Sequence, residues 1–127
     1  MKYLGVDYGS KKVGLAFSDD GGSLAFPHSV LPNDEALFDT VKELIEVNGV
    51  EALVIGHSLA MDGSENPIMG QAHAFKDIFE QSGLHVYLEP EFLTTFQAKR
   101  NTEDAMADAA AAALILQSFL DKKQNEA

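Results

Sequence analysis

Three carboxylates occupy positions where the surrounding residues predict an apolar side chain. Asp7 ends one short apolar run, Glu91 follows another, and Asp108 interrupts an alanine-rich helical pattern. A carboxylate on an apolar face is costly unless a cation compensates its charge. Oxygen-only ligands suit Mg²⁺ or Mn²⁺, and two such ions can promote the attack of water on a phosphodiester. If the fold brings these acids together, the sequence predicts metal-dependent chemistry on phosphates.

Each acid also has a purely structural interpretation. Asp7 could cap a turn, and Glu91 could be a solvated loop acid, with Glu89 as a competing candidate for the site. Asp108 could simply be favoured near the positive end of a helix. The catalytic interpretation therefore depends on the elements that position the three side chains.

Hydrophobic periodicity and turn residues predict those elements. Strands are expected over residues 2–8, 13–18, 23–31, 52–55 and 84–88, and helices over about 34–48, 65–81, 94–101 and 104–123. Pro27 favours an edge position for the third strand, and Asn33 and Gly49 are expected to cap the first helix. Ile78 is expected on the inner side of the second helix, and residues 56–58 are expected to end the fourth strand.

This order predicts an α/β fold with a mixed five-stranded sheet. The first three strands form an antiparallel meander, the later strands are parallel, and helices cover both faces. Sites in such sheets lie at the carboxyl ends of the parallel strands. If the last strand lies beside the first, Asp7, Glu91 and Asp108 can converge.

The bulk composition limits the possible classes of protein. The 127 residues fit a single domain, expected over 1–123, with a frayed tail at 124–127. The chain has no cysteine, and charge interrupts the N-terminal apolar run too early for a signal peptide, so we expect a cytoplasmic protein without a membrane partner. A net charge of −11 disfavours tight non-specific binding of nucleic acid, but metal ions could supply positive charge at a site.

Four segments resemble the YqgF family of RuvC-like resolvases, which are also described as pre-16S rRNA nucleases. Residues 5–16 read Gly-Val-Asp-Tyr-Gly-Ser-Lys-Lys-Val-Gly-Leu-Ala, and further matches lie at 54–65, 91–98 and 108–121. The resemblance implies an RNase H-like three-layer fold. It also implies that Asp7, Glu91 and Asp108 form an acidic triad that binds Mg²⁺ or Mn²⁺, with two ions expected.

Several polar residues near the acids are candidates for phosphate contacts. They are Ser10, Lys11, Lys12, Thr94, Lys99 and Arg100. His57 is interpreted as an exposed loop histidine, and His28, His73 and His85 receive no role because they share no metal-ligand spacing.

Three functional hypotheses follow. The leading one is a metal-dependent nuclease for precursor 16S rRNA or, alternatively, for a Holliday junction, acting as a monomer or homodimer. The second is a binding or regulatory module with the same fold, because Pro90 and Phe92 replace the aspartate and arginine that the family usually has there. The last is a nucleotide-hydrolysing domain of the actin and sugar-kinase type, which would need a second such domain.

Overall fold

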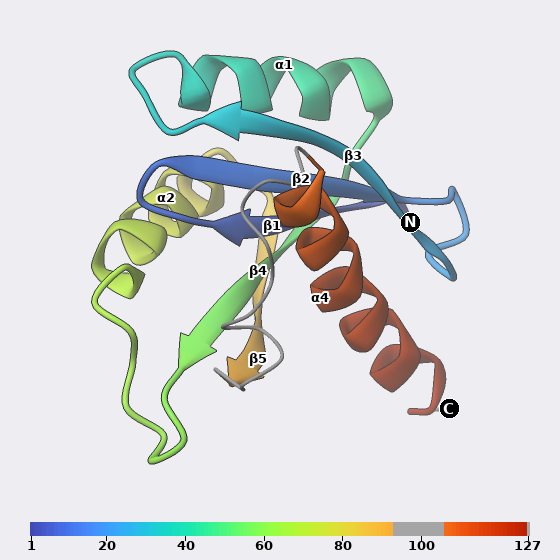
Figure 1. The fold of residues 1–127 in the computed structure, drawn as a ribbon. Coiled ribbons are helices and arrows are strands. Elements are labelled where there is room, and N and C mark those ends of the chain that lie inside the picture. The colour runs from blue at the N-terminus through green and yellow to red at the C-terminus, as the bar shows by residue number, and fades with distance from the viewer. Residues whose placement is uncertain (93–105, 127) are drawn as a thin grey trace.

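A computed structural model describes residues 1–92 and 106–126, which form one sheet with helices on both faces (Figure 1). The elements are β1 (Tyr3–Tyr8), β2 (Lys12–Ser18), β3 (Ala25–Pro32), α1 (Leu37–Asn48), β4 (Ala52–Leu59), α2 (Met69–Gln81), β5 (His85–Phe92) and α4 (Ala107–Gln124). The helix expected at 94–101 lies outside the described residues. Within the described ranges, no helix is long and apolar enough to cross a membrane.

The sheet has five strands in the order β3-β2-β1-β4-β5. The pairs β1–β2 and β2–β3 are antiparallel, whereas β1–β4 and β4–β5 are parallel, which confirms the predicted mixed sheet. The last strand does not lie beside the first, because β4 lies between them. Residues 52–56 of β4 are fully buried and need a neighbour on each side, whereas residues 86–88 of β5 are half-buried, as suits an edge strand.

Alternate side chains along the strands pack in two separate hydrophobic cores, one on each face of the sheet. Leu53 and Ile55 of β4 belong to the core beneath α1 and α2. Ala52 and Val54 point to the other face and pack in the core beneath α4. The three layers expected for this fold are therefore α1 and α2, the sheet, and α4.

Glycines on the sheet allow α4 to lie unusually close to it. A Cβ atom on Gly5 would lie 2.8 Å from the Cβ atom of Leu116, and a Cβ atom on Gly14 would overlap the backbone carbonyl of Asp108. The alanines of α4 contribute to the same close approach, since Ala112 is fully buried. The first turn of α4 is thereby held against the β1–β2 hairpin.

The role of Asn33 differs from the prediction. Helix α1 begins at Leu37 with Ala36 at the N-cap position, so Asn33 does not cap it. Its side-chain Nδ2 instead donates to the Gly9 carbonyl at 2.8 Å, and its backbone N–H donates to the Lys11 carbonyl at 2.9 Å. Two hydrogen bonds to the hairpin satisfy this residue better than a helix end three residues away.

Three further boundaries or faces were predicted wrongly. Strand β4 continues through Leu59, and β5 continues through Phe92, because the two strands pair along their whole length. Ile78 is 46% exposed, since the buried face of α2 consists of Met69, Ala72, Phe75 and Phe79. Gly49 does end α1, with a left-handed φ of 67° as predicted.

Candidate active site at the sheet edge

Asp7 lies near the carboxyl end of β1, where the parallel strands β1, β4 and β5 share one edge of the sheet. It pairs with Gly14 across the antiparallel β1–β2 ladder. On its other side, the β1–β4 register pairs Val6 with Ile55, so one residue further along both strands Asp7 is level with Gly56. Asp7 therefore has a glycine beside it on each neighbouring strand. Directly opposite residues point to the same face, so the Asp7 side chain is on the α4 face with the missing side chain of Gly14.

Glu91 reaches this edge from β5. It lies within the strand, paired with Ser58, rather than in a loop after it. A Cβ atom on Gly56 would lie 3.0 Å from Glu91 Oε2. Because neighbouring strands are about 4.8 Å apart, the long side chain places its carboxylate roughly one strand from Asp7, although the two backbones are two strands apart.

Asp108 approaches Asp7 from the opposite side. It is in the first turn of α4, and its backbone carbonyl packs on Gly14, the residue opposite Asp7. Asp7, Glu91 and Asp108 are all half-buried. The structure thus places the three predicted acids on the same face and at the same end of the sheet, with Asp7 between the other two.

The donor set at this edge fits a hard divalent cation. Three carboxylates offer only oxygen ligands, which is the chemistry that Mg²⁺ and Mn²⁺ prefer. A Cβ atom on Gly56 would lie 2.7 Å from Ile115 Cδ1 and 3.0 Å from Glu91 Oε2, so the glycine lets both side chains approach the strand next to Asp7.

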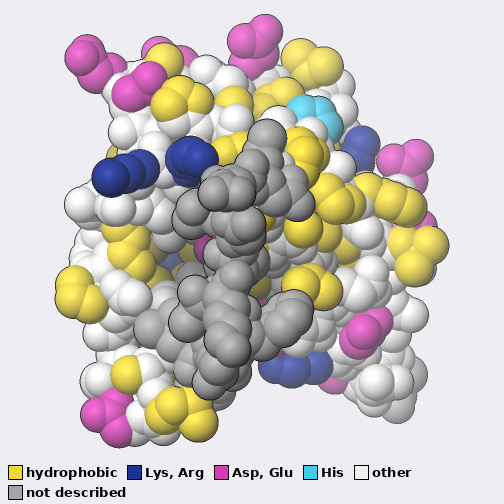
Figure 2. Space-filling view, viewed as in Figure 1, with side chains coloured by type: hydrophobic (Ala, Val, Ile, Leu, Met, Phe, Trp, Pro, Cys, Tyr) yellow, Lys and Arg dark blue, Asp and Glu magenta, His cyan; other side chains and the backbone are white. Residues whose placement is uncertain are grey.

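The predicted phosphate contacts are only partly described. Ser10 and Lys11 lie in the β1–β2 turn, Lys12 begins β2, and all three are exposed beside Asp7. Thr94, Lys99 and Arg100 lie outside the described residues. On the described surface in Figure 2, basic side chains occur singly or in a pair among acidic ones rather than as a continuous patch.

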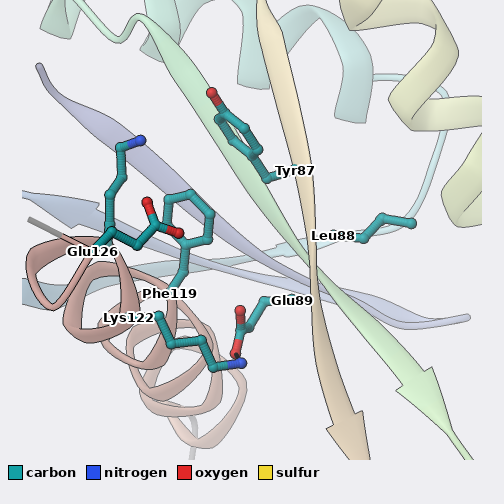
Figure 3. Close-up of a pocket in the computed structure, with 7 residues that line it drawn as sticks. Tyr87, Leu88, Glu89, Phe119, Lys122 and Glu126 are labelled. Carbon is teal, nitrogen blue, oxygen red and sulfur yellow. Dashed lines mark hydrogen bonds and ion pairs between the residues drawn. The ribbon is translucent and has the colours of Figure 1, made fainter.

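Glu89, the competing candidate, has a structural role. Its side chain is 4% exposed and accepts hydrogen bonds from Ser118 Oγ at 2.9 Å and Lys122 Nζ at 2.6 Å. Figure 3 shows Glu89 of β5 and Lys122 of α4 directed toward one another. This carboxylate fastens the C-terminal half of α4 to the sheet.

One cluster of ligand-type side chains was missed in the sequence. His57, Glu65 and His73 form the one set of three described residues whose potential ligand atoms all lie within 4.8 Å of one another. The three acids do not meet this distance criterion. His57 lies within β4 rather than in a loop, and His73, to which the sequence assigned no role, lies beside the same Glu65 carboxylate. The interval from each histidine to Glu65 is eight residues. Because these intervals cross a strand end, a turn and a helix start, spacing alone did not reveal the cluster.

The sheet order, with helices on both faces, defines an RNase H-like fold. Thermus thermophilus RuvC has this architecture, with a TM-score of 0.61 and 15% identity over 98% of this chain and 97% of that chain. The fowlpox virus Holliday junction resolvase matches with a TM-score of 0.57 and 12% identity over 97% of this chain and 99% of that chain.

The chain belongs to the family described as "RuvX: Holliday junction resolvase", whose model matches residues 1–122. A relative from Nitratidesulfovibrio vulgaris (strain DSM 19637 / Miyazaki F), named "Putative pre-16S rRNA nuclease", is 38% identical over 95% of this chain and 94% of its own length. A relative of the same name from Lawsonia intracellularis is 36% identical over 99% of this chain and 97% of its own length. The resemblance to the YqgF family seen in the sequence is thereby confirmed.

Proposed function

We propose that this chain is a divalent-metal-dependent nuclease that hydrolyses phosphodiester bonds of structured nucleic acid. Asp7, Glu91 and Asp108 are its catalytic residues and hold the metal. The observation that supports the proposal is the position of these half-buried acids on one face and at one end of the sheet. Two glycines, Gly14 and Gly56, let Asp108 and Glu91 approach the strands next to Asp7.

The arrangement around Asp7 suits a pair of ions. Asp7 is flanked by Glu91 on the β4 side and by Asp108 on the β2 side, so it can contribute oxygens toward both neighbours. The chemistry that divalent ions supply in such sites is neutralisation of phosphate charge and activation of the attacking water. The protein contributes the fixed positions of the carboxylates, since Asp7 is in a paired strand and Asp108 in a docked helix turn.

The β1–β2 hairpin would position the substrate. Asn33 fixes its backbone through the carbonyl groups of Gly9 and Lys11. Lys11 and Lys12 would contact phosphates on either side of the cut bond, and Ser10 would orient the polar groups of the turn. Further phosphates would be bound by Thr94, Lys99 and Arg100.

Precursor 16S rRNA is the substrate that we favour. The name of the relatives supports it, and so does the small basic surface of a chain with a net charge of −11. A four-way junction needs a wider contact area and a two-fold dimer to cut two symmetric strands, whereas one strand of RNA can be cut by a monomer. Processing of ribosomal precursors would take place in the cytoplasm.

The test is a cleavage assay with purified protein and Mg²⁺ or Mn²⁺. The substrates are a precursor 16S rRNA fragment with its flanking extensions, a synthetic four-way DNA junction and a linear duplex. We expect the wild-type chain to cut the rRNA fragment, and Asp7→Asn to reduce the rate by at least about a hundredfold. Asp39→Asn, which changes an exposed acid of α1, is the matched control and should leave the rate unchanged.

The possible outcomes separate the hypotheses. Cutting of the junction alone would replace the rRNA assignment by the resolvase alternative. Equal cutting by the Asp7→Asn protein would identify a contaminating nuclease. Substrate binding without cutting by the wild-type protein would favour the regulatory-module alternative.

A further inference from the structure

Two histidines converge on one carboxylate at the other face of the same sheet edge. His57 Nε2 lies 2.6 Å from Glu65 Oε2, and His73 Nε2 lies 2.9 Å from the same oxygen. The imidazole ring centroids are 6.2 Å apart, with an angle of 71° between the ring planes. Both ring nitrogens thus contact the same carboxylate oxygen, and the three potential ligand atoms all lie within 4.8 Å of one another.

This cluster is separate from the acidic edge. His57 is two residues beyond Ile55, whose side chain packs in the core beneath α1 and α2, so the imidazole lies on that face of β4. The contact with His73 of α2 agrees with that placement. Asp7, Glu91 and Asp108 are on the α4 face, and the sheet lies between the two groups.

The backbone holds Glu65 in place without help from its side chain. Glu65 forms an antiparallel bridge with Leu59 at the end of β4. The turn between them is closed by the Ala60 N–H, which donates to the Ser64 carbonyl at 2.8 Å. The Asn66 N–H then donates to the Ser58 carbonyl at 2.9 Å. The carboxylate therefore emerges from a short hairpin that is already fixed to β4.

We propose that His57, Glu65 and His73 form a second metal site, which binds Zn²⁺ or a similar nitrogen-preferring divalent ion. Metal–nitrogen and metal–oxygen bonds of about 2.0–2.2 Å put neighbouring ligand atoms about 3.4 Å apart in a tetrahedral site. The present nitrogen-to-oxygen distances of 2.6 and 2.9 Å need to open by less than about 1 Å, with loss of the Nε2 protons.

The surroundings suit such an ion. The side chains of His57, His73 and Glu65 are 25%, 40% and 45% exposed, so water can enter and complete the coordination. Hydrogen bonds from His73 and His57 lower the pKa of Glu65. Two imidazoles favour zinc, cobalt, nickel or copper over magnesium, so the two sites would select different ions.

Occupation of this site would tie three segments together. The ligands come from β4, from the connection between β4 and α2, and from α2 itself. A bound ion would therefore fasten the 60–68 connection to both of its flanking elements. Because an ion that binds only the folded chain stabilises it, the melting temperature should rise as metal is added.

The test is a titration of chelator-treated full-length protein with Zn²⁺ and with Co²⁺. We expect one equivalent of Zn²⁺ to bind and to raise the melting temperature. We also expect one equivalent of Co²⁺ to give the visible absorption bands of a site with nitrogen ligands. His73→Gln and Glu65→Gln should each weaken Zn²⁺ binding by at least about tenfold. The matched control is His85→Gln, which replaces an exposed histidine at the start of β5. This variant should bind Zn²⁺ with the affinity of the wild type.

Two further comparisons make the result decisive. Asp108→Asn should leave Zn²⁺ affinity unchanged, because it alters only the acidic edge, so failure of this inference is distinct from failure of the nuclease assignment. Circular dichroism of metal-free His73→Gln protein should match the wild type, since the replaced side chain is only partly buried. Equal Zn²⁺ affinity in wild type and His73→Gln, or loss of binding in Asp108→Asn instead, would overturn the proposal.

Discussion

Glu89 and Glu91 are two residues apart on β5 and point to the same face, yet their surroundings differ. The Glu89 carboxylate is buried and bonded to Ser118 and Lys122 of α4. The Glu91 carboxylate instead extends over Gly56 toward the end of β1. At the scale of single residues, the function of an acid is decided by what the facing helix and the neighbouring strand place next to it.

Lys122 should be needed for stability because it compensates a buried charge. In Lys122→Ala, the Glu89 carboxylate would keep only the Ser118 hydrogen bond, and we expect the free energy of unfolding to fall by about 1–2 kcal/mol. Urea unfolding followed by circular dichroism measures this change. Lys42→Ala on the exposed surface of α1 is the control, with an expected change below about 0.5 kcal/mol. Similar losses in both variants would mean that the Glu89–Lys122 pair contributes nothing specific.

At the scale of elements, the docking of α4 depends on glycines in three adjacent strands. Gly5 of β1 faces Leu116, Gly14 of β2 faces Asp108, and Gly56 of β4 faces Ile115. A side chain at any of them would push the helix away from the sheet. The same glycines therefore set both the packing of the second core and the position of Asp108.

Gly14→Ala should damage both stability and activity. Its Cβ atom would overlap the Asp108 backbone, so we expect a loss of about 1–3 kcal/mol in the free energy of unfolding. The cleavage rate of the remaining folded protein should also fall, because Asp108 is displaced. Gly70→Ala in the first turn of α2 is the matched control, since a Cβ atom there meets nothing within 4 Å. That change should stabilise the chain by about 0.4–1 kcal/mol, and a similar destabilisation of both variants would contradict the close-docking explanation.

The sequence predicted which elements form better than where they end or which neighbours they choose. Alternation in residues 2–8 and the helical stripe that includes Leu37 and Val41 identified β1 and α1, because burial of one face leaves a periodic pattern. The extension of β5 to Phe92 could not be predicted, since it depends on pairing with β4. The position of β4 between β1 and β5 likewise depends on burial from both sides, which local patterns do not specify.

The candidate site was predictable only in part for a similar reason. The acids were visible as charges in apolar contexts, but their convergence requires Gly14 and Gly56 to be level with Asp7 across the sheet. The grouping of His57 with His73 could not be predicted, because it depends on the antiparallel bridge that places Glu65 beside Leu59 at the end of β4. Both groupings depend on where glycines and turns lie in the folded chain, which the pattern of residues along the sequence does not specify.

At the scale of the whole molecule, the chain carries a net charge of −11 and nine basic residues. Nucleic acid would therefore be held by a few local contacts and by metal ions, rather than by a wide basic surface. Lys11 and Lys12 are exposed cations of the hairpin that follows Asp7.

Salt dependence should report these contacts one by one. The logarithm of the association constant falls linearly with the logarithm of salt concentration, by about 0.7–0.9 per neutralised phosphate. Lys11→Ala and Lys12→Ala should each make this slope shallower by about 0.7–0.9, which corresponds to the loss of one phosphate contact. Lys42→Ala on α1 should leave the slope unchanged. Fluorescence anisotropy with a labelled rRNA fragment at several salt concentrations gives the slopes, and unchanged slopes in both hairpin variants would remove the hairpin from the binding surface.

The most direct test of the acidic site is a Mg²⁺ titration followed by amide NMR spectra. Mg²⁺ is chosen because the histidine cluster should not bind it. We expect saturable shifts at Asp7, Gly14, Gly56 and Asp108 in the wild-type chain, and their loss in Asp7→Asn while the rest of the spectrum is unchanged. Absence of these shifts in the wild type, or the same shifts in Asp7→Asn, would contradict the assignment of this sheet edge as the metal-holding active site.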